Sequence, residues 1–103
     1  MDIEQIRKSA AEGQINWQRH ALSRMLERNI SRDEVTDVIS LGEIIEEYPN
    51  DYPLPSCLMF YNDITPLHVV LSYNETNQMT YIITAYQPDL NHFEVDFKTR
   101  RRQ

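Results

Sequence analysis

The chain has 103 residues, a formal net charge of -6, 41% hydrophobic residues and a single cysteine. This length predicts one domain over residues 1–103 with a modest core, and the lone cysteine excludes an internal disulfide and suits a reducing compartment. The N-terminus lacks the apolar core of a signal peptide, and no apolar run reaches membrane-spanning length. We therefore expect a soluble, cytoplasmic protein without a membrane partner.

Helical periodicity predicts three helices, over residues 3–12, 17–28 and about 31–41. Gly13 and Gly42 each follow a helical pattern, at the position where C-terminal caps commonly lie. Ser31 and Glu34 fit a capping box, in which the serine accepts from a free backbone amide and the glutamate reaches back. The first 42 residues are therefore predicted to be helical.

After residue 42 the pattern changes to β-branched and aromatic segments, which predict the four strands EIIEEY, SCLMFYN, TPLHVVLSY and MTYIITAY. The first two are separated by the proline-rich stretch PNDYPLPS, which predicts an irregular loop. Short polar connections between the others predict hairpins. We therefore expect an α+β fold, with N-terminal helices packed on one face of a four-stranded antiparallel meander sheet.

The charge is unevenly distributed along the chain. Residues 1–32 sum to +2, residues 33–97 to -12 and residues 98–103 to +4, which together give -6. This balance disfavours nonspecific adhesion to nucleic acid. A local basic site requires the two ends of the chain to meet in space. The alternative is a solvated acidic surface with basic termini.

His20, Arg24 and Arg28 recur every four residues within the second predicted helix. Positions i, i+4 and i+8 lie on one helix face, so three potential cations are placed side by side. An anion such as a phosphate would explain this arrangement. The alternative is that the two arginines form ordinary surface ion pairs with nearby acids.

Two other candidates lie on predicted strands. Alternation places His68 on one face of its strand, either in a cleft or as a satisfied core histidine. Thr84 and Tyr86 end the last strand and are predicted to share a face with Ile82. Tyr86 could reach a cleft at the sheet edge, although tyrosine is a common strand residue.

Metal and cofactor motifs are not found in the sequence. Cys57 and the three histidines are isolated from one another, without the spacing of a metal site, and two glycines cannot form a phosphate-cradling loop. We therefore expect no metal and no cofactor.

The segments HALSRMLERNIS, GEIIEEYPNDYPLPSCLMF, PLHVV, IITAYQPD and FEVDF…RR together resemble the domain of unknown function 4258 family. The resemblance covers about residues 15–101. It implies a relationship to RelE-like and BrnT-like toxins, whose fold sets helices against an antiparallel sheet and whose members include many metal-independent ribonucleases. It also implies an antitoxin partner with zinc-finger or helix-turn-helix character. The matching motifs carry His20, Arg24, Arg28, His68 and Tyr86.

A metal-free ribonuclease mechanism can be written with these residues. The 2′-hydroxyl of RNA attacks the adjacent phosphate, so the reaction needs a base, an acid and cations. We expect His20 and His68 to share the acid and base roles, and Arg24 to bind the scissile phosphate. Further roles as donors or phosphate ligands are expected for Tyr86, Arg28, Thr84, Arg100 and Arg101. The net charge opposes action on bulk RNA, unless the site is locally positive or a ribosome presents the substrate.

Two rival functions remain open. A noncatalytic interaction module, such as an inactive toxin relative, would use the proline-rich loop and the acidic residues Glu43, Glu46, Glu47 and Asp51 to bind a basic partner. A metal-dependent hydrolase is the other rival. Catalysis by two histidines requires His20 and His68 to meet within about 10 Å in one open cleft. If they are buried apart, the interaction module is favoured.

Overall fold

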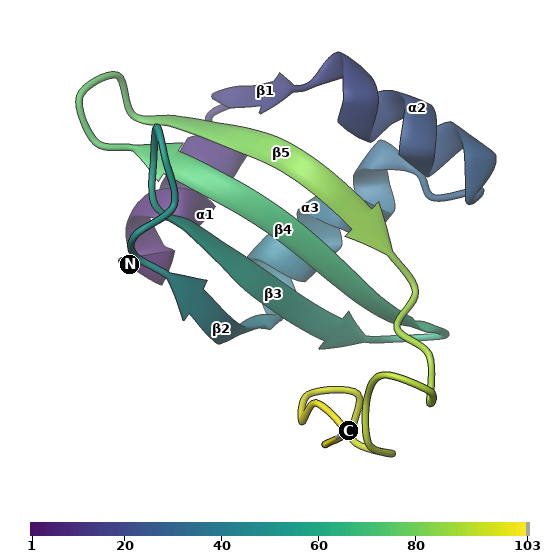
Figure 1. Cartoon of the computed structure of the whole chain (residues 1–103). Coiled ribbons are helices and arrows are strands. Elements are labelled where there is room, and N and C mark those ends of the chain that lie inside the picture. The colour runs from purple at the N-terminus through teal and green to yellow at the C-terminus, as the bar shows by residue number, and fades with distance from the viewer. Residues whose placement is uncertain (103) are drawn as a thin grey trace.

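The computed structural model describes residues 1–102 and contains three helices and a five-stranded sheet (Figure 1). The helices are α1 (Ile3–Ala11), α2 (Arg19–Glu27) and α3 (Arg32–Leu41). The strands are β1 (Ile15–Trp17), β2 (Glu43–Tyr48), β3 (Ser56–Asn62), β4 (Pro66–Asn74) and β5 (Met79–Tyr86). Within residues 1–102 no helix is long and apolar enough to span a membrane.

The sheet has the order β1-β5-β4-β3-β2, and β2 to β5 form the predicted antiparallel meander. The prediction of four strands and a purely antiparallel sheet is wrong, because β1 adds a fifth strand parallel to β5. Ile15 lies opposite Thr80 and Trp17 opposite Ile82, and the Gln14 carbonyl accepts from the Thr80 amide. Three residues are too few for a strand pattern to be recognised, and the predicted helix over residues 17–28 is therefore wrong at Trp17, which lies in β1.

The helix ends show two different uses of glycine. Gly13 follows α1 with φ +74°, a conformation that glycine adopts without strain. Gly42 has extended backbone and is needed for space, since a Cβ there would lie 2.3 Å from the Phe60 carbonyl oxygen. The capping box predicted for Ser31 and Glu34 is present at the start of α3.

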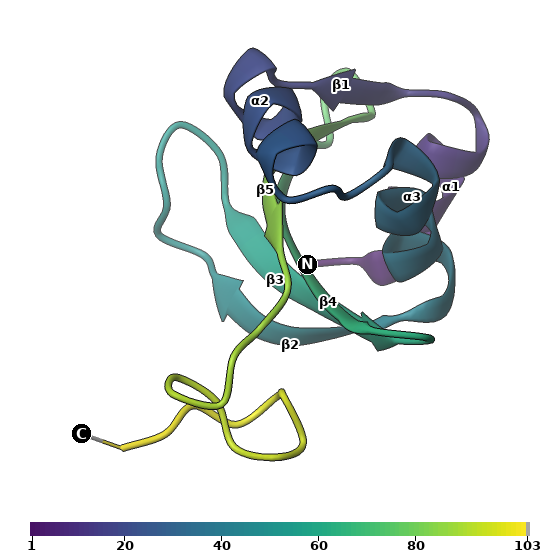
Figure 2. The same ribbon diagram turned by 90° about the vertical axis from the view of Figure 1, so that its right-hand side faces the viewer.

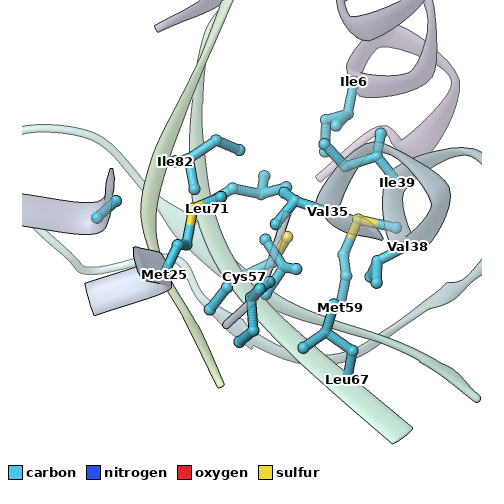
Figure 3. Packing of buried hydrophobic residues seen from close by; sticks show 14 of the residues in the cluster. Ile6, Met25, Val35, Val38, Ile39, Cys57, Met59, Leu67, Leu71 and Ile82 are labelled. Carbon is cyan, nitrogen blue, oxygen red and sulfur yellow. The ribbon is translucent and has the colours of Figure 1, made fainter. Parts of the chain in front are cut away.

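All three helices contribute to one core on the same side of the sheet (Figures 2 and 3). α1 and α3 cover this face, and α2 lies along β5. Core side chains come from Ile6 of α1, Met25 of α2, Val35, Val38 and Ile39 of α3, and Cys57, Met59, Val69, Leu71 and Ile82 of the sheet. The opposite side of the sheet, called here the helix-free face, is flanked by the β2–β3 connection and by the C-terminal segment (Figure 2).

A β-bulge in β5 decides which side chains reach the helix-free face. Thr84 pairs with Val70 and Ile82 with Leu71, so the register shifts by one residue between these pairs. The prediction that Ile82 shares a face with Thr84 and Tyr86 is therefore wrong, and Ile82 is fully buried in the core. The bulge leaves Thr84 and Tyr86 on the helix-free face.

Candidate functional site

His20 lies in the first turn of α2 and is exposed at a cavity of about 620 Å³. The cavity lies between the N-terminal end of α2, the β2–β3 connection and the helix-free face. Its lining residues are Gln18, His20, Asp51, Tyr52, Pro53, Leu54, Ser72, Asn74, Tyr81 and Ile83. This volume is within the range of small-molecule sites, and apolar walls with a few polar groups are typical of them.

Several of these lining residues were not recognised from the sequence. Tyr81 and Asn74 face the cavity only because the β4–β5 hairpin is paired in the observed register. Ser72 could have been found, because alternation already placed it on the same face as His68. The proline-rich loop was predicted as an interaction surface, and its Tyr52 is 95% exposed beside the cavity.

Arg24 lies one helical turn after His20 and remains exposed. Its guanidinium contacts Glu27 at 3.1 Å, in a pair whose two side chains are each about half exposed. Such exposed pairs contribute little free energy and are screened by salt. Arg24 can therefore exchange this carboxylate for another anion at small cost.

Arg28 and Thr84 are brought together by the structure. Nη1 of Arg28 donates to Oγ1 of Thr84 at 3.3 Å and to the carbonyl oxygen of Ala85 at 2.9 Å. The predicted strip on α2 therefore runs beside β5, with His20 near the cavity and Arg28 near the C-terminal end of the strand. The two bonds to β5 fix the position of the Arg28 side chain.

His68 is placed in a different environment and has no exposed surface. Its Nε2 lies 2.7 Å from the Phe97 carbonyl oxygen, so Nε2 carries the proton and donates. Nδ1 lies 3.3 Å from the Tyr86 hydroxyl, which is then the donor in that bond. Phe60, Tyr86 and Phe93 contact the imidazole edge-on. Burial lowers the pKa of His68, which favours a neutral ring.

A charged network surrounds the His68 pocket. Arg100 donates two hydrogen bonds to Glu46, at 2.8 and 3.1 Å, and its guanidinium lies 4.9 Å from the centre of the Phe93 ring. Glu46 also accepts a short hydrogen bond from Tyr48. Burial acts to raise the pKa of Glu46, but the hydrogen bonds from Arg100 and Tyr48 outweigh it and the pKa is lowered. Burial, and then the bond to Glu46, raise the pKa of Tyr48 to about 12.

The remaining predicted charges are largely engaged within the chain. Arg101 pairs with Glu94 at 2.9 Å and also donates to the Leu90 carbonyl oxygen. The acidic residues expected to meet a basic partner have internal contacts as well. Glu43 pairs with Lys98, Glu46 with Arg100, Glu47 with the amino group of Met1, and Asp51 accepts from Ser56.

The two histidines do not share an open cleft. His68 is sealed, whereas His20 opens onto the cavity. Ser72 on the cavity wall is four residues from His68 along β4, a separation of about 13 Å at the usual rise per residue. The condition set for catalysis by two histidines is not met, so that mechanism fails and the interaction module gains support. The condition does not apply to a mechanism that uses His20 without His68. Within residues 1–102 no group of three or more His, Cys, Asp or Glu side chains is arranged to hold a metal ion.

The chain matches the family model of the domain of unknown function DUF4258 over residues 17–87. The chain belongs to the DUF4258 family. No curated protein and no solved structure matches the chain.

The DUF4258 unit begins at Trp17, the last residue of β1, and ends just after β5, so it contains the strip on α2 and also His68. Two segments lie outside it. One is α1, whose Ile6 is fully buried in the core. The other is the C-terminal segment, which supplies Phe93, Phe97 and Arg100 to the His68 pocket.

Proposed function

We propose that this DUF4258 protein is a cytoplasmic, RelE-like or BrnT-like toxin relative that binds single-stranded RNA along α2 and β5 and cleaves it without a metal. The observation that carries the proposal is the strip of His20, Arg24 and Arg28, which begins at the cavity and ends at Thr84. Eight residues of α-helix span about 12 Å, which is long enough for arginines to contact successive phosphates of one strand.

The cavity suits an unpaired nucleobase beside that backbone. Tyr52 and Tyr81 offer aromatic faces for stacking, and Gln18 and Asn74 offer amides for the edge of a base. The absence of lysine and arginine from the cavity lining suits a neutral base, and the cations outside it suit the phosphates.

In the proposed reaction His20 acts only as the base, and His68 takes no part because it is buried. His20 accepts the proton of the 2′-hydroxyl, the oxygen forms a bond to phosphorus, and the bond to the 5′-oxygen breaks. Arg24 stabilises the charge that develops on the phosphorane. The leaving 5′-oxygen takes its proton from solvent or from Tyr81, which lines the same cavity.

The test compares binding and cleavage separately. Cleavage of a fluorescent single-stranded RNA is expected to fall at least about 100-fold in His20→Ala, the lower end of general acid–base contributions. A fall of at least about 100-fold is also expected in Arg24→Ala, as for the loss of one group that stabilises charge in the transition state. His92→Gln and Lys8→Gln are matched controls with exposed side chains outside the site. Binding is followed by anisotropy with the same RNA methylated at its 2′-oxygens, which cannot be cleaved. Cleavage unchanged in both alanine variants would refute the proposal.

A second candidate is a noncatalytic binding module that recognises an antitoxin-like protein. The observation that favours it is the sealed His68, since His20 then lacks a second histidine for proton transfer. Binding of the methylated RNA without any cleavage of the unmodified RNA would support a module that binds RNA. Neither binding nor cleavage, at confirmed folding, would leave the protein-binding module as the better interpretation.

A further inference from the structure

Residues 88–101, called here the strap, form a loop with its own internal hydrogen bonds. Asp89 accepts from the backbone amides of Asn91 and His92, and Asp96 accepts from those of Lys98 and Thr99. Two backbone bonds then close the loop, from Glu94 to Thr99 and from Arg101 to His92. The hydrogen bonds to Asp96 lower its pKa to about 2, so its carboxylate stays charged over the whole physiological range.

Aromatic and polar contacts attach the strap to the sheet. Phe93 is 3% exposed, with its ring centre 4.6 Å from that of His68. The Phe97 carbonyl oxygen accepts from His68, Arg100 pairs with Glu46, and Lys98 pairs with Glu43 at 3.1 Å. Apart from Phe93 and Pro88, which are buried, and Phe97, which is half-buried, the strap is exposed or intermediate, and both of its ion pairs to β2 are partly exposed.

The strap also lies beyond the matched family unit, which ends at residue 87. It seals side chains that the strand register directs away from the core. His68 pairs with Tyr86 in the β4–β5 ladder and with Phe60 in the β3–β4 ladder, so all three point to the helix-free face. Above that face, the Phe93 ring and the Phe97 carbonyl oxygen of the strap contact His68 and cover it.

We propose that the strap is a releasable cover that closes the His68 end of the helix-free face, so that His68 and Tyr86 meet a ligand only after the strap is displaced. Tyr86 follows Thr84 by two residues on one face, and Thr84 is bonded to Arg28. Displacement would extend the α2–β5 site by a histidine and a tyrosine. The identification of this ligand as RNA rests on the proposed function. The opening of the strap is independent of it.

Acid should favour release. The titratable and charged groups near His68 are Glu46 and Tyr48 from β2, Tyr86 from β5 and Arg100 from the strap, while β3 contributes the uncharged Phe60. Glu46 is already paired with Arg100, so it compensates the charge of a protonated, buried His68 only in part. Burial lowers the pKa of His68 below 6.5, and a released histidine regains its ordinary pKa. The covered state is therefore favoured above pH 6.5 and weakens as the pH falls toward the lowered pKa.

The opening is tested in the full-length chain by the accessibility of His68. Diethyl pyrocarbonate modifies accessible neutral imidazoles, and peptide mapping separates His68 from His20 and His92. At pH 7 the rate at His68 should rise about tenfold or more in Phe93→Ala and in Arg100→Gln, because local opening becomes more frequent as strap contacts are removed. Arg102→Gln, an exposed residue next to the strap, is the matched control.

An NMR titration of the His68 ring gives an independent readout. Its midpoint should lie below 6.5 in the wild type and move up toward that value in the two strap variants. A protected His68 with an unchanged midpoint in both folded variants would overturn the strap proposal. If His68 becomes accessible but methylated RNA binds no better, the strap proposal stands and the RNA proposal fails at this end of the face. If His68 stays protected while the methylated RNA binds the variants at least as tightly as the wild type, the strap proposal fails and the RNA proposal stands.

Discussion

The two ends of the helix-free face place a histidine in opposite environments. At one end His20 lies on a helix surface beside a cavity of about 620 Å³. At the other end His68 is fully buried, bonded at both ring nitrogens and surrounded by three aromatic rings. The same residue type is therefore accessible to a substrate in one place and part of the packing in the other.

This difference shows what a histidine needs before it can act on a ligand. Proton transfer requires access to the reacting atoms and a ring nitrogen that is not held elsewhere. His20 has the access, whereas His68 has both nitrogens bonded and is covered by residues outside the family unit. The strap decides this contrast, because it supplies Phe93 and Phe97.

The largest expected effect is a difference between His68 and His20 in how much each side chain contributes to the free energy of unfolding. His68→Ala removes a fully buried ring and leaves the Phe97 carbonyl without its partner, so it should lower the free energy of unfolding by about 2–4 kcal/mol. His20→Ala removes an exposed ring and should change it by less than about 0.5 kcal/mol. Urea denaturation measures both. Equal effects would contradict the distinction between a packed and an accessible histidine.

A smaller effect is expected in the pH dependence of stability. Since burial lowers the pKa of His68, the unfolded chain binds a proton at this site before the folded chain does. Stability from this group is complete above pH 6.5 and declines as the pH falls, by at most about 1.4 kcal/mol per pH unit.

The variant His68→Gln isolates that contribution from the carboxylates of the chain. Glutamine keeps hydrogen-bonding groups but does not titrate. Denaturation of the wild type and of His68→Gln is measured between pH 7.5 and 5. As the pH falls, the wild type should lose more stability than the variant, so that the difference between their free energies of unfolding shrinks. A constant difference across this range would mean that His68 is protonated equally in the folded and unfolded chains.

Much of the fold could be predicted because its signals are local. The capping box at Ser31 and the four β-rich segments specify α3 and the meander by short-range pattern. β1 could not be predicted, since three residues carry too little periodicity and pair with β5 more than 60 positions away. The bulge at Ile83 was missed for a related reason, because pairing with β4 determines it.

The candidate site was predictable in its composition but not in its grouping. The spacing of His20, Arg24 and Arg28 indicated a single strip, and Arg28 does reach Thr84. For His68 the sequence left a cleft and a satisfied core histidine open, and the structure shows the second, a buried ring with both nitrogens bonded. The sequence could not decide between them, since the burial depends on where residues 88–101 fold. Charge pattern alone did not reveal that Arg100 would bind Glu46 across 54 positions.

The smallest effect compares one ion pair from each end of the face. Arg100 and Glu46 form a two-bond pair in which the glutamate side chain is 22% exposed, whereas Arg24 and Glu27 are joined by one bond and are about half exposed. Double-mutant cycles with glutamine should give a coupling of about 0.5–1 kcal/mol for the strap pair and about 0.3 kcal/mol or less for the helix pair. Raising the salt concentration should weaken the helix pair more, because exposed charges are better screened. If the helix pair couples as strongly as the strap pair, Arg24 is held by Glu27. The proposal that Arg24 is free to bind a phosphate would then be wrong.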